Sequence, residues 1–243
     1  MSADVAYASA YPMIRERVEA AALRAGRSGQ VRLLAVSKAQ PDDKLLSVLQ
    51  DGCRLFGENY VQEFLGKQER LPHLPGGEPF AHDVQWHFIG HLQTNKVKSI
   101  LPFVSLIHSV DRSSLVQELQ RRAASLNKTQ AILLEVNLGG EASKSGIEPA
   151  ALESLAREVA SSPNLRLEGL MCIPPASTPE EARPFFQQLR RLRDALETTL
   201  GQPLPELSMG MSSDFEVAIE EGATLVRVGT ALFGARHRPV EPA

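Results

Sequence analysis

Short apolar runs alternate with helix-like segments along the whole chain, and this alternation is the feature that most restricts the fold. Each run is rich in Val, Ile and Leu, and each is followed by a segment with helical signals. Such alternation predicts a parallel sheet, and the 243 residues are close to the ~250 that a (β/α)8 barrel uses. The predicted strands are 31–36, 54–56, 84–89, 104–110, 131–136, 165–173, 204–209 and 224–228.

The predicted fold is an α/β protein: one TIM-type barrel over residues 1–243, with an extra N-terminal helix at 5–25. A doubly wound open sheet is the alternative. Polar residues end almost every predicted strand, and a closed barrel would gather those ends into one ring, whereas an open sheet would disperse them. The proline- and glycine-rich segment 71–83 is predicted to be a surface loop and not a domain boundary, because the alternation resumes after it.

Composition limits the cellular setting and the partners. The formal charge of -3 and the pI near 6.1 give no general attraction to nucleic acid or to an anionic membrane. Residues 1–10 carry no secretory signal, no apolar stretch is long enough to span a bilayer, and Cys53 and Cys172 lack metal-ligand spacing. We expect a cytoplasmic monomer in a reducing compartment, without nucleic-acid or membrane partners.

Lys38 directly follows the first apolar run and its Ser37. At the end of a barrel strand it would lie at the rim, where desolvation lowers the pKa of an ammonium group and exposes the amine needed for a Schiff base. The alternative is an ordinary solvated lysine on a loop. The residues at the ends of the other predicted strands therefore decide the role of Lys38.

Two late segments indicate a phosphate site. Ser212 and Ser213 follow the seventh run, and Gly229 and Thr230 follow the eighth. Barrels frequently bind phosphate after strands seven and eight, where backbone N–H groups and hydroxyls converge. Helix N-capping by the serines and a tight turn at Gly229 are the alternatives for each residue taken alone.

Arg227 interrupts the apolar eighth run two residues before Gly229. A guanidinium remains charged, so it can donate a hydrogen bond to a pyridine nitrogen and keep that nitrogen unprotonated. An unprotonated ring is a weaker electron sink for carbanions. The alternative is a buried salt bridge, for instance to Glu135 or Glu168.

Three histidines, His87, His91 and His108, raise the question of a metal site. His87 and His91 are four residues apart, but Gly90 and the expected strand-to-loop transition lie between them, and no carboxylate or thiol cluster accompanies them. We therefore predict no metal site.

Six segments together resemble the pyridoxal phosphate homeostasis protein family, whose barrel is like the N-terminal domain of alanine racemase. The resemblance covers residues 5 to 236 and lacks a recognisable pattern only at 71–83. The matching segments are Ala35-Val-Ser-Lys38, Phe56-Gly-Glu-Asn-Tyr-Val-Gln-Glu63, Trp86-His-Phe-Ile-Gly-His-Leu-Gln-Thr-Asn-Lys96, Ser143-Lys-Ser-Gly146, Leu207-Ser-Met-Gly-Met-Ser212 and Arg227-Val-Gly-Thr230.

The resemblance implies that pyridoxal 5′-phosphate is bound as a Schiff base on Lys38, with Arg227 as partner of the pyridine nitrogen. It also implies a role in holding the cofactor for the cell, together with contact with small amines or amino acids. The remaining implied cofactor-binding residues are Ser212, Gly229 and Thr230 at the phosphate, and Asn59 and His87 near the ring.

An amino-acid racemase and a Schiff-base lyase that uses Lys38 alone are the alternative functions. Racemases that share this barrel take one acid/base group from a tyrosine in a further domain, and here the chain ends at Ala243. The three tyrosines, Tyr7, Tyr11 and Tyr60, lie early in the sequence. We therefore expect a binding protein without a catalytic reaction.

Overall fold

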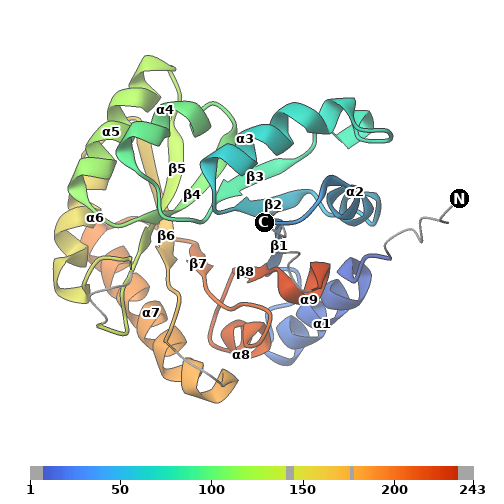
Figure 1. The fold of residues 1–243 in the computed structure, drawn as a ribbon. Coiled ribbons are helices and arrows are strands. Elements are labelled where there is room, and N and C mark those ends of the chain that lie inside the picture. Colours follow the sequence, from blue (N-terminus) through green and yellow to red (C-terminus); the bar gives the residue numbers. More distant parts are fainter. Residues whose placement is uncertain (1–7, 81, 141–144, 176–177, 235–243) are drawn as a thin grey trace, which may run out of the picture.

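Eight parallel strands form a closed barrel in the order of the sequence, with β8 pairing back to β1 (Figure 1). The structure, a computed structural model, describes residues 8–80, 82–140, 145–175 and 178–234. The predicted barrel is confirmed, and the open-sheet alternative was wrong. The strands are β1 (Arg32–Val36), β2 (Leu55–Glu58), β3 (Gln85–Phe88), β4 (Val104–Val110), β5 (Gln130–Glu135), β6 (Leu165–Met171), β7 (Glu206–Ser208) and β8 (Leu225–Val228).

The helices surround the strands, as Figure 1 shows. The predicted N-terminal helix is present as α1, which packs against α8. No helix among the described residues is both long enough and apolar enough to cross a membrane. The helices are α1 (Tyr11–Arg24), α2 (Asp42–Gln50), α3 (Val61–Arg70), α4 (Val97–Ile100), α5 (Ser113–Ser125), α6 (Leu152–Ala160), α7 (Pro179–Leu200), α8 (Phe215–Glu220) and α9 (Thr230–Phe233).

Alternate residues of each strand face the barrel interior, because successive side chains of a strand point to opposite sides. In β1, Leu34 and Val36 belong to a small cluster inside the barrel, whereas Leu33 and Ala35 pack with the helices. In β8, Leu225 faces inward and its neighbours Val226 and Val228 face outward. Since both faces are buried, the strands read as continuous apolar runs in the sequence.

One local expectation needs correction. Residues 71–83 are not a plain surface loop: they contain two single-turn 3₁₀ helices, Leu71–His73 and Glu78–Phe80, and Leu71 is buried in the core.

The helix α5 has Arg112 at its N-cap and no side-chain cap, although Asp111 directly precedes Arg112 and Ser113 directly follows it. Asp111 instead pairs with Arg112 and accepts a hydrogen bond from the backbone of Gly146.

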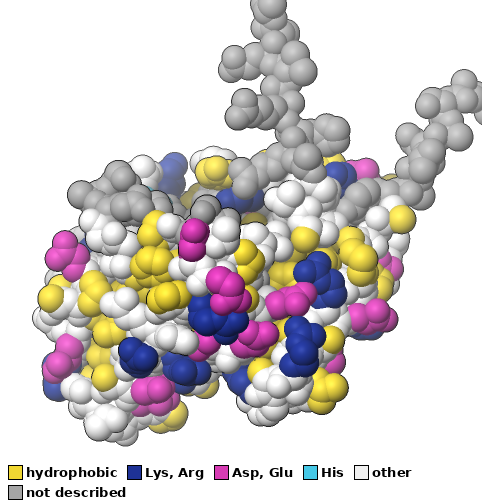
Figure 2. All heavy atoms as spheres, turned by 90° about the horizontal axis from the view of Figure 1, so that it is seen from below, with side chains coloured by type: hydrophobic (Ala, Val, Ile, Leu, Met, Phe, Trp, Pro, Cys, Tyr) yellow, Lys and Arg dark blue, Asp and Glu magenta, His cyan; other side chains and the backbone are white. Residues whose placement is uncertain are grey.

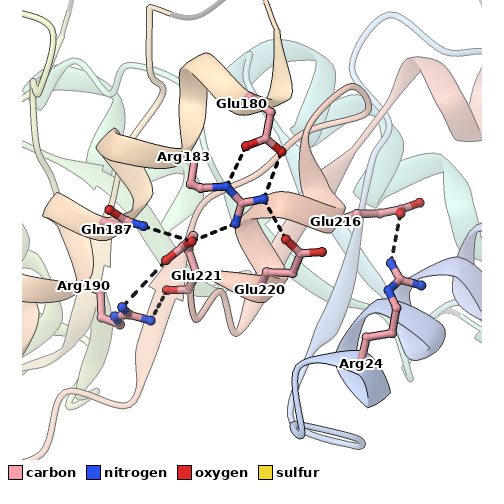
Figure 3. Close-up of polar contacts among 8 residues, drawn as sticks. All are labelled: Arg24, Glu180, Arg183, Gln187, Arg190, Glu216, Glu220 and Glu221. Atoms are coloured by element: carbon pink, nitrogen blue, oxygen red, sulfur yellow. Dashed lines mark hydrogen bonds and ion pairs between the residues drawn. The ribbon is translucent and has the colours of Figure 1, made fainter.

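Ion pairs join the outer helices α7 and α8. Arg183 of α7 contacts Glu180 on its own helix, Glu220 at the end of α8 and Glu221 directly after it (Figure 3). Arg190 also reaches Glu221 from α7. On the face drawn in Figure 2, described side chains of both charges are interspersed with hydrophobic ones.

Candidate functional site

A pocket of about 570 Å³ opens at the carboxyl ends of the strands, and we call it the main pocket. Six of the seven predicted cofactor-binding residues line it; His87 does not. Segments that are far apart in the sequence thus meet in one place, as expected at this end of a barrel. The main pocket is lined by Val36, Lys38, Gln40, Asn59, Ile89, Ile173, Met211, Ser212, Ser213, Arg227, Gly229, Thr230 and Ala231.

The backbone on both sides of Lys38 is fixed by a buried polar cluster. Lys67 of α3 donates to the carbonyl of Ser37 and to Glu58 Oε1, the latter at 2.8 Å, and Ser37 Oγ donates to Glu58 at 2.6 Å. On the other side, the N–H of Ala39 donates to Glu63, which also pairs with Lys67.

This cluster costs free energy to bury, so its presence beside Lys38 is informative. Burial raises the pKa of Glu58, and the charge of Lys67 works against that rise. Ala39 has a φ of 56°, in the left-handed region that residues with a Cβ seldom adopt. The turn that carries Lys38 is therefore held in one shape by contacts that a simple solvated loop would not need.

The loops after β7 and β8 are joined by Ser212. Its Oγ accepts hydrogen bonds from the backbone N–H groups of Gly229, at 3.3 Å, and Ala231, at 3.2 Å. Thr230 lies between these two donors and is exposed toward the pocket. The two backbone donors thus fix the Ser212 hydroxyl close to that of Thr230, and two hydroxyls on one part of the main pocket can donate to an anionic oxygen group.

Gly210 is required where β7 leads into the Ser212 loop. Its φ is 89°, and a Cβ there would lie 2.5 Å from the Cβ of Ala218 in α8. Only glycine permits both this conformation and this close packing. The loop that carries Ser212 can therefore lie directly over α8.

Arg227 is 4% exposed and points into the barrel, two residues after the inward-facing Leu225. Its Nη1 donates to Ser208 Oγ at 2.7 Å, and its Nη2 donates to the carbonyl oxygen of Cys172 at 2.9 Å. Neither Glu135 nor Glu168, the alternative partners considered above, forms a salt bridge with it among the described residues. Burial lowers the pKa of Arg227, and the nearby Cys172, Glu135 and Asp214 oppose that shift.

A chain of hydrogen bonds runs from Arg227 across the barrel interior. Ser208 Oγ lies 2.8 Å from His108 Nδ1, and His108 Nε2 lies 2.9 Å from His87 Nδ1. Since Arg227 donates to Ser208, the hydroxyl hydrogen is available for His108 Nδ1. His108 Nε2 then carries the hydrogen that His87 accepts, and both imidazoles are neutral.

His87 is thus connected to the main pocket through His108, Ser208 and Arg227, and it lines no part of the pocket itself. Burial lowers the pKa of His87 to about 3 and that of His108 well below its usual value. The neutral state of both rings agrees with the direction of the hydrogen bonds. Within the described part of the chain, no group of three or more His, Cys, Asp or Glu side chains could hold a metal ion.

Sequence reasoning missed several residues of the main pocket. Gln40 is 7% exposed, and its Oε1 is buried without a hydrogen-bond partner, as is Asn59 Oδ1. Ile89 and Ile173 form an apolar wall of the main pocket. Gln40 follows the turn that carries Lys38, where the alternation of β1 no longer applies, so the strand pattern gave no signal for it. Of the Ser143–Gly146 segment, residues 143 and 144 lie outside the described residues.

The sequence matches the family described as alanine racemase, N-terminal domain, over residues 12–237. It is 49% identical over 225 residues to a "Pyridoxal phosphate homeostasis protein" of Aquifex aeolicus, covering 92% of this chain and 95% of that protein. The protein of the same name from Pseudomonas aeruginosa is 47% identical over 226 residues, covering 92% and 93%.

Among solved structures, PipY of Synechococcus elongatus PCC7942 with pyridoxal phosphate bound superposes with a TM-score of 0.77. It shares 38% sequence identity and covers 89% of this chain and 98% of its own. Barrel, pocket and sequence agree: this chain belongs to the alanine racemase N-terminal domain family and, within it, to the pyridoxal phosphate homeostasis proteins.

Proposed function

We propose that this protein binds pyridoxal 5′-phosphate, holds it as a Schiff base on Lys38 and serves the intracellular homeostasis of the cofactor. The observation that carries the proposal is the main pocket, in which Lys38, Arg227, Ser212 and Thr230 meet. The relatives named for this role support it, because they match nearly the whole chain.

The residues present fit this cofactor. A cavity of about 570 Å³ is within the range of small-molecule sites. Gln40 Oε1 and Asn59 Oδ1 are buried acceptors without a partner, and a buried polar atom without a partner is costly unless a ligand satisfies it. The hydroxyls of Ser212 and Thr230, of which the first is held in place by the backbone N–H groups of Gly229 and Ala231, offer donors suited to a phosphate group.

Each side chain has a distinct task in this proposal. Bound, the cofactor supplies an aldehyde that reacts with primary amines, and Lys38 supplies the amine. Arg227 would donate a hydrogen bond to the pyridine nitrogen, and because its guanidinium stays charged it would not transfer that proton to the nitrogen. Asn59 would lie near the ring, whereas His87 would act at a distance, by fixing His108, Ser208 and so Arg227.

We also propose that the protein is a monomer that catalyses no reaction of its own. Racemisation needs an acid/base group on each face of the reacting carbon. Among the described tyrosines, Tyr11 is buried in α1, and burial raises its pKa to about 12. Tyr60 is 59% exposed and does not line the main pocket. Tyr7 lies outside the described residues.

Reduction with borohydride tests the proposal directly. We expect the protein incubated with pyridoxal phosphate to become yellow, and borohydride to fix one phosphopyridoxyl group on Lys38, identified by peptide mass spectrometry. The Lys38→Ala variant should lose the colour, and the exposed-lysine control Lys98→Ala should keep it.

Two outcomes would contradict the proposal. A label on another lysine, with Lys38→Ala fully coloured, would remove the Schiff-base assignment. The second concerns catalysis: holo-protein with L-alanine in deuterated water should keep the α-proton signal in NMR, with a racemase as control. Loss of that signal near the control's rate would favour the racemase alternative.

A further inference from the structure

A second pocket of about 280 Å³ adjoins the main pocket, and we call it the side pocket. The two pockets share Asn59, Ile89 and Ile173, so they are neighbours across a common wall. The side pocket is otherwise lined by residues from the ends of β3, β5 and β6. They include Glu135, His91 and Ser145.

Glu135 is the acidic group of the side pocket, and it has no hydrogen-bond or ion-pair partner among the described residues. It follows the inward-facing Ala131 and Leu133 of β5 in the alternating pattern, so its side chain also points into the barrel. The residue is 7% exposed, and its carboxylate forms no hydrogen bond or ion pair with any residue that the structure describes. The charge of Arg227 acts on this carboxylate only through space, and a buried carboxylate that no cation contacts directly is unfavourable.

The other charged groups around Glu135 are already engaged. Asp111 pairs with Arg112 and accepts from the backbone of Gly146, and Arg227 donates to Ser208 and Cys172. His91 lies 3.4 Å from Ser145 Oγ. Glu135 therefore provides the negative charge of this pocket that is open to a ligand.

We propose that the side pocket binds the ammonium group of a small primary amine, with Glu135 as its counter-charge. An ammonium group has three donors, and Asn59 Oδ1 is a buried acceptor without a partner on the shared wall. Ile89 and Ile173 provide apolar surface for the alkyl part. The inference rests on the proposed function in one respect: an amine bound in the side pocket would lie beside the cofactor in the main pocket.

Electrostatics make this binding dependent on pH. Burial, with a smaller contribution from Asp111, raises the pKa of Glu135 to about 7, and Arg227 opposes the rise. A cation binds the ionised carboxylate, whose fraction grows from about one tenth at pH 6 to nine tenths at pH 8. Amine affinity should therefore rise roughly tenfold between pH 6 and pH 8.

The test is a titration of the full-length protein, free of cofactor, with n-propylammonium chloride. The methyl signals of ¹³C-labelled isoleucine report the binding, since Ile89 and Ile173 line the pocket. We expect saturating shifts of these two methyl groups, binding at least tenfold weaker for n-propanol, and a tenfold gain in affinity from pH 6 to pH 8. Glu135→Gln should lose both the affinity and the pH dependence.

The exposed Glu148→Gln carries the same charge change outside the pocket and should behave like the wild type. Equal binding by Glu135→Gln and wild type, equal binding of propanol, or no shift at Ile89 and Ile173 would each overturn the inference. A parallel titration with pyridoxal phosphate separates the two proposals: cofactor binding without amine binding removes only this inference, and the reverse removes only the proposed function.

Discussion

Arg227 is a buried cation that is held by neutral acceptors. Its two contacts among the described residues are a hydroxyl and a backbone carbonyl, and its charge is balanced by Glu135 and Asp214 through space. Neutral acceptors leave the guanidinium charge available to a ligand at low dielectric, where electrostatic attraction is strong. The histidine chain behind Ser208 keeps the guanidinium in one orientation, at the wall of the main pocket.

The phosphate hypothesis gives a prediction at the level of single side chains. Replacing Ser212 and Thr230 together by alanine should weaken pyridoxal phosphate binding by roughly 100-fold or more, because each lost charge-assisted hydrogen bond is worth about 1.5–3 kcal/mol. Pyridoxal, which lacks the phosphate, should lose far less. Spectrophotometric titration with both ligands measures the difference, and the exposed Ser125→Ala, outside both pockets, serves as control. Equal losses for both ligands would mean that the phosphate binds elsewhere.

Single residues could be predicted where sequence and strand direction coincide. Lys38, Ser212 and Thr230 come shortly after apolar runs and Arg227 interrupts one, so their place at the carboxyl ends could be read from the sequence. The unpaired state of Glu135 could not be predicted, because its position in the sequence indicates only a candidate partner for Arg227. Whether a strand-end carboxylate is paired depends on the stagger of neighbouring strands, and that register appears only in the folded barrel.

At the scale of elements, the strands were predictable and the connections were less so. A strand that is buried on both faces shows itself as a continuous apolar run, and each of the eight was found. Before the first turn of α5, Asp111 binds Arg112 and the backbone of Gly146 and does not cap the helix, which no local pattern reveals. Similarly, Leu71 is buried, so part of the proline-rich segment 71–83 belongs to the core.

Arg183 gives a prediction about how two elements are joined. It connects α7 to Glu220 and to the largely buried Glu221, so Arg183→Gln should lower the free energy of unfolding by about 1–2 kcal/mol. Arg121→Gln is the matched control, since Arg121 pairs with Glu118 within α5 and should cost less than about 0.5 kcal/mol. Urea unfolding measures both. Equal losses of unfolding free energy in the two variants would show that the ion pairs between α7 and α8 (Figure 3) stabilise the fold no more than an ion pair within one helix.

The stability of the whole molecule should depend on the buried histidines in acid. Burial depresses the pKa of His87 to about 3, whereas the unfolded chain has its usual value near 6.5. Between these values the unfolded state binds more protons, so stability falls as the pH decreases from about 6.5 towards 3. From pH 7 to pH 5 one such histidine removes about 2 kcal/mol. Glu58 and Glu135, whose pKa values are raised, act in the opposite direction over part of this range.

A comparison of variants isolates the contribution of His87 from those carboxylates. In His87→Gln the amide oxygen can still accept from His108, and the titrating group is gone, so the loss of stability from pH 7 to pH 5 should be about 2 kcal/mol smaller than in the wild type. The exposed His73→Gln should leave that loss unchanged. Urea unfolding at the two pH values gives all three numbers. If His87→Gln and wild type lose the same stability, the ring takes up its proton in the folded barrel, and the neutral hydrogen-bond chain to Arg227 is wrong.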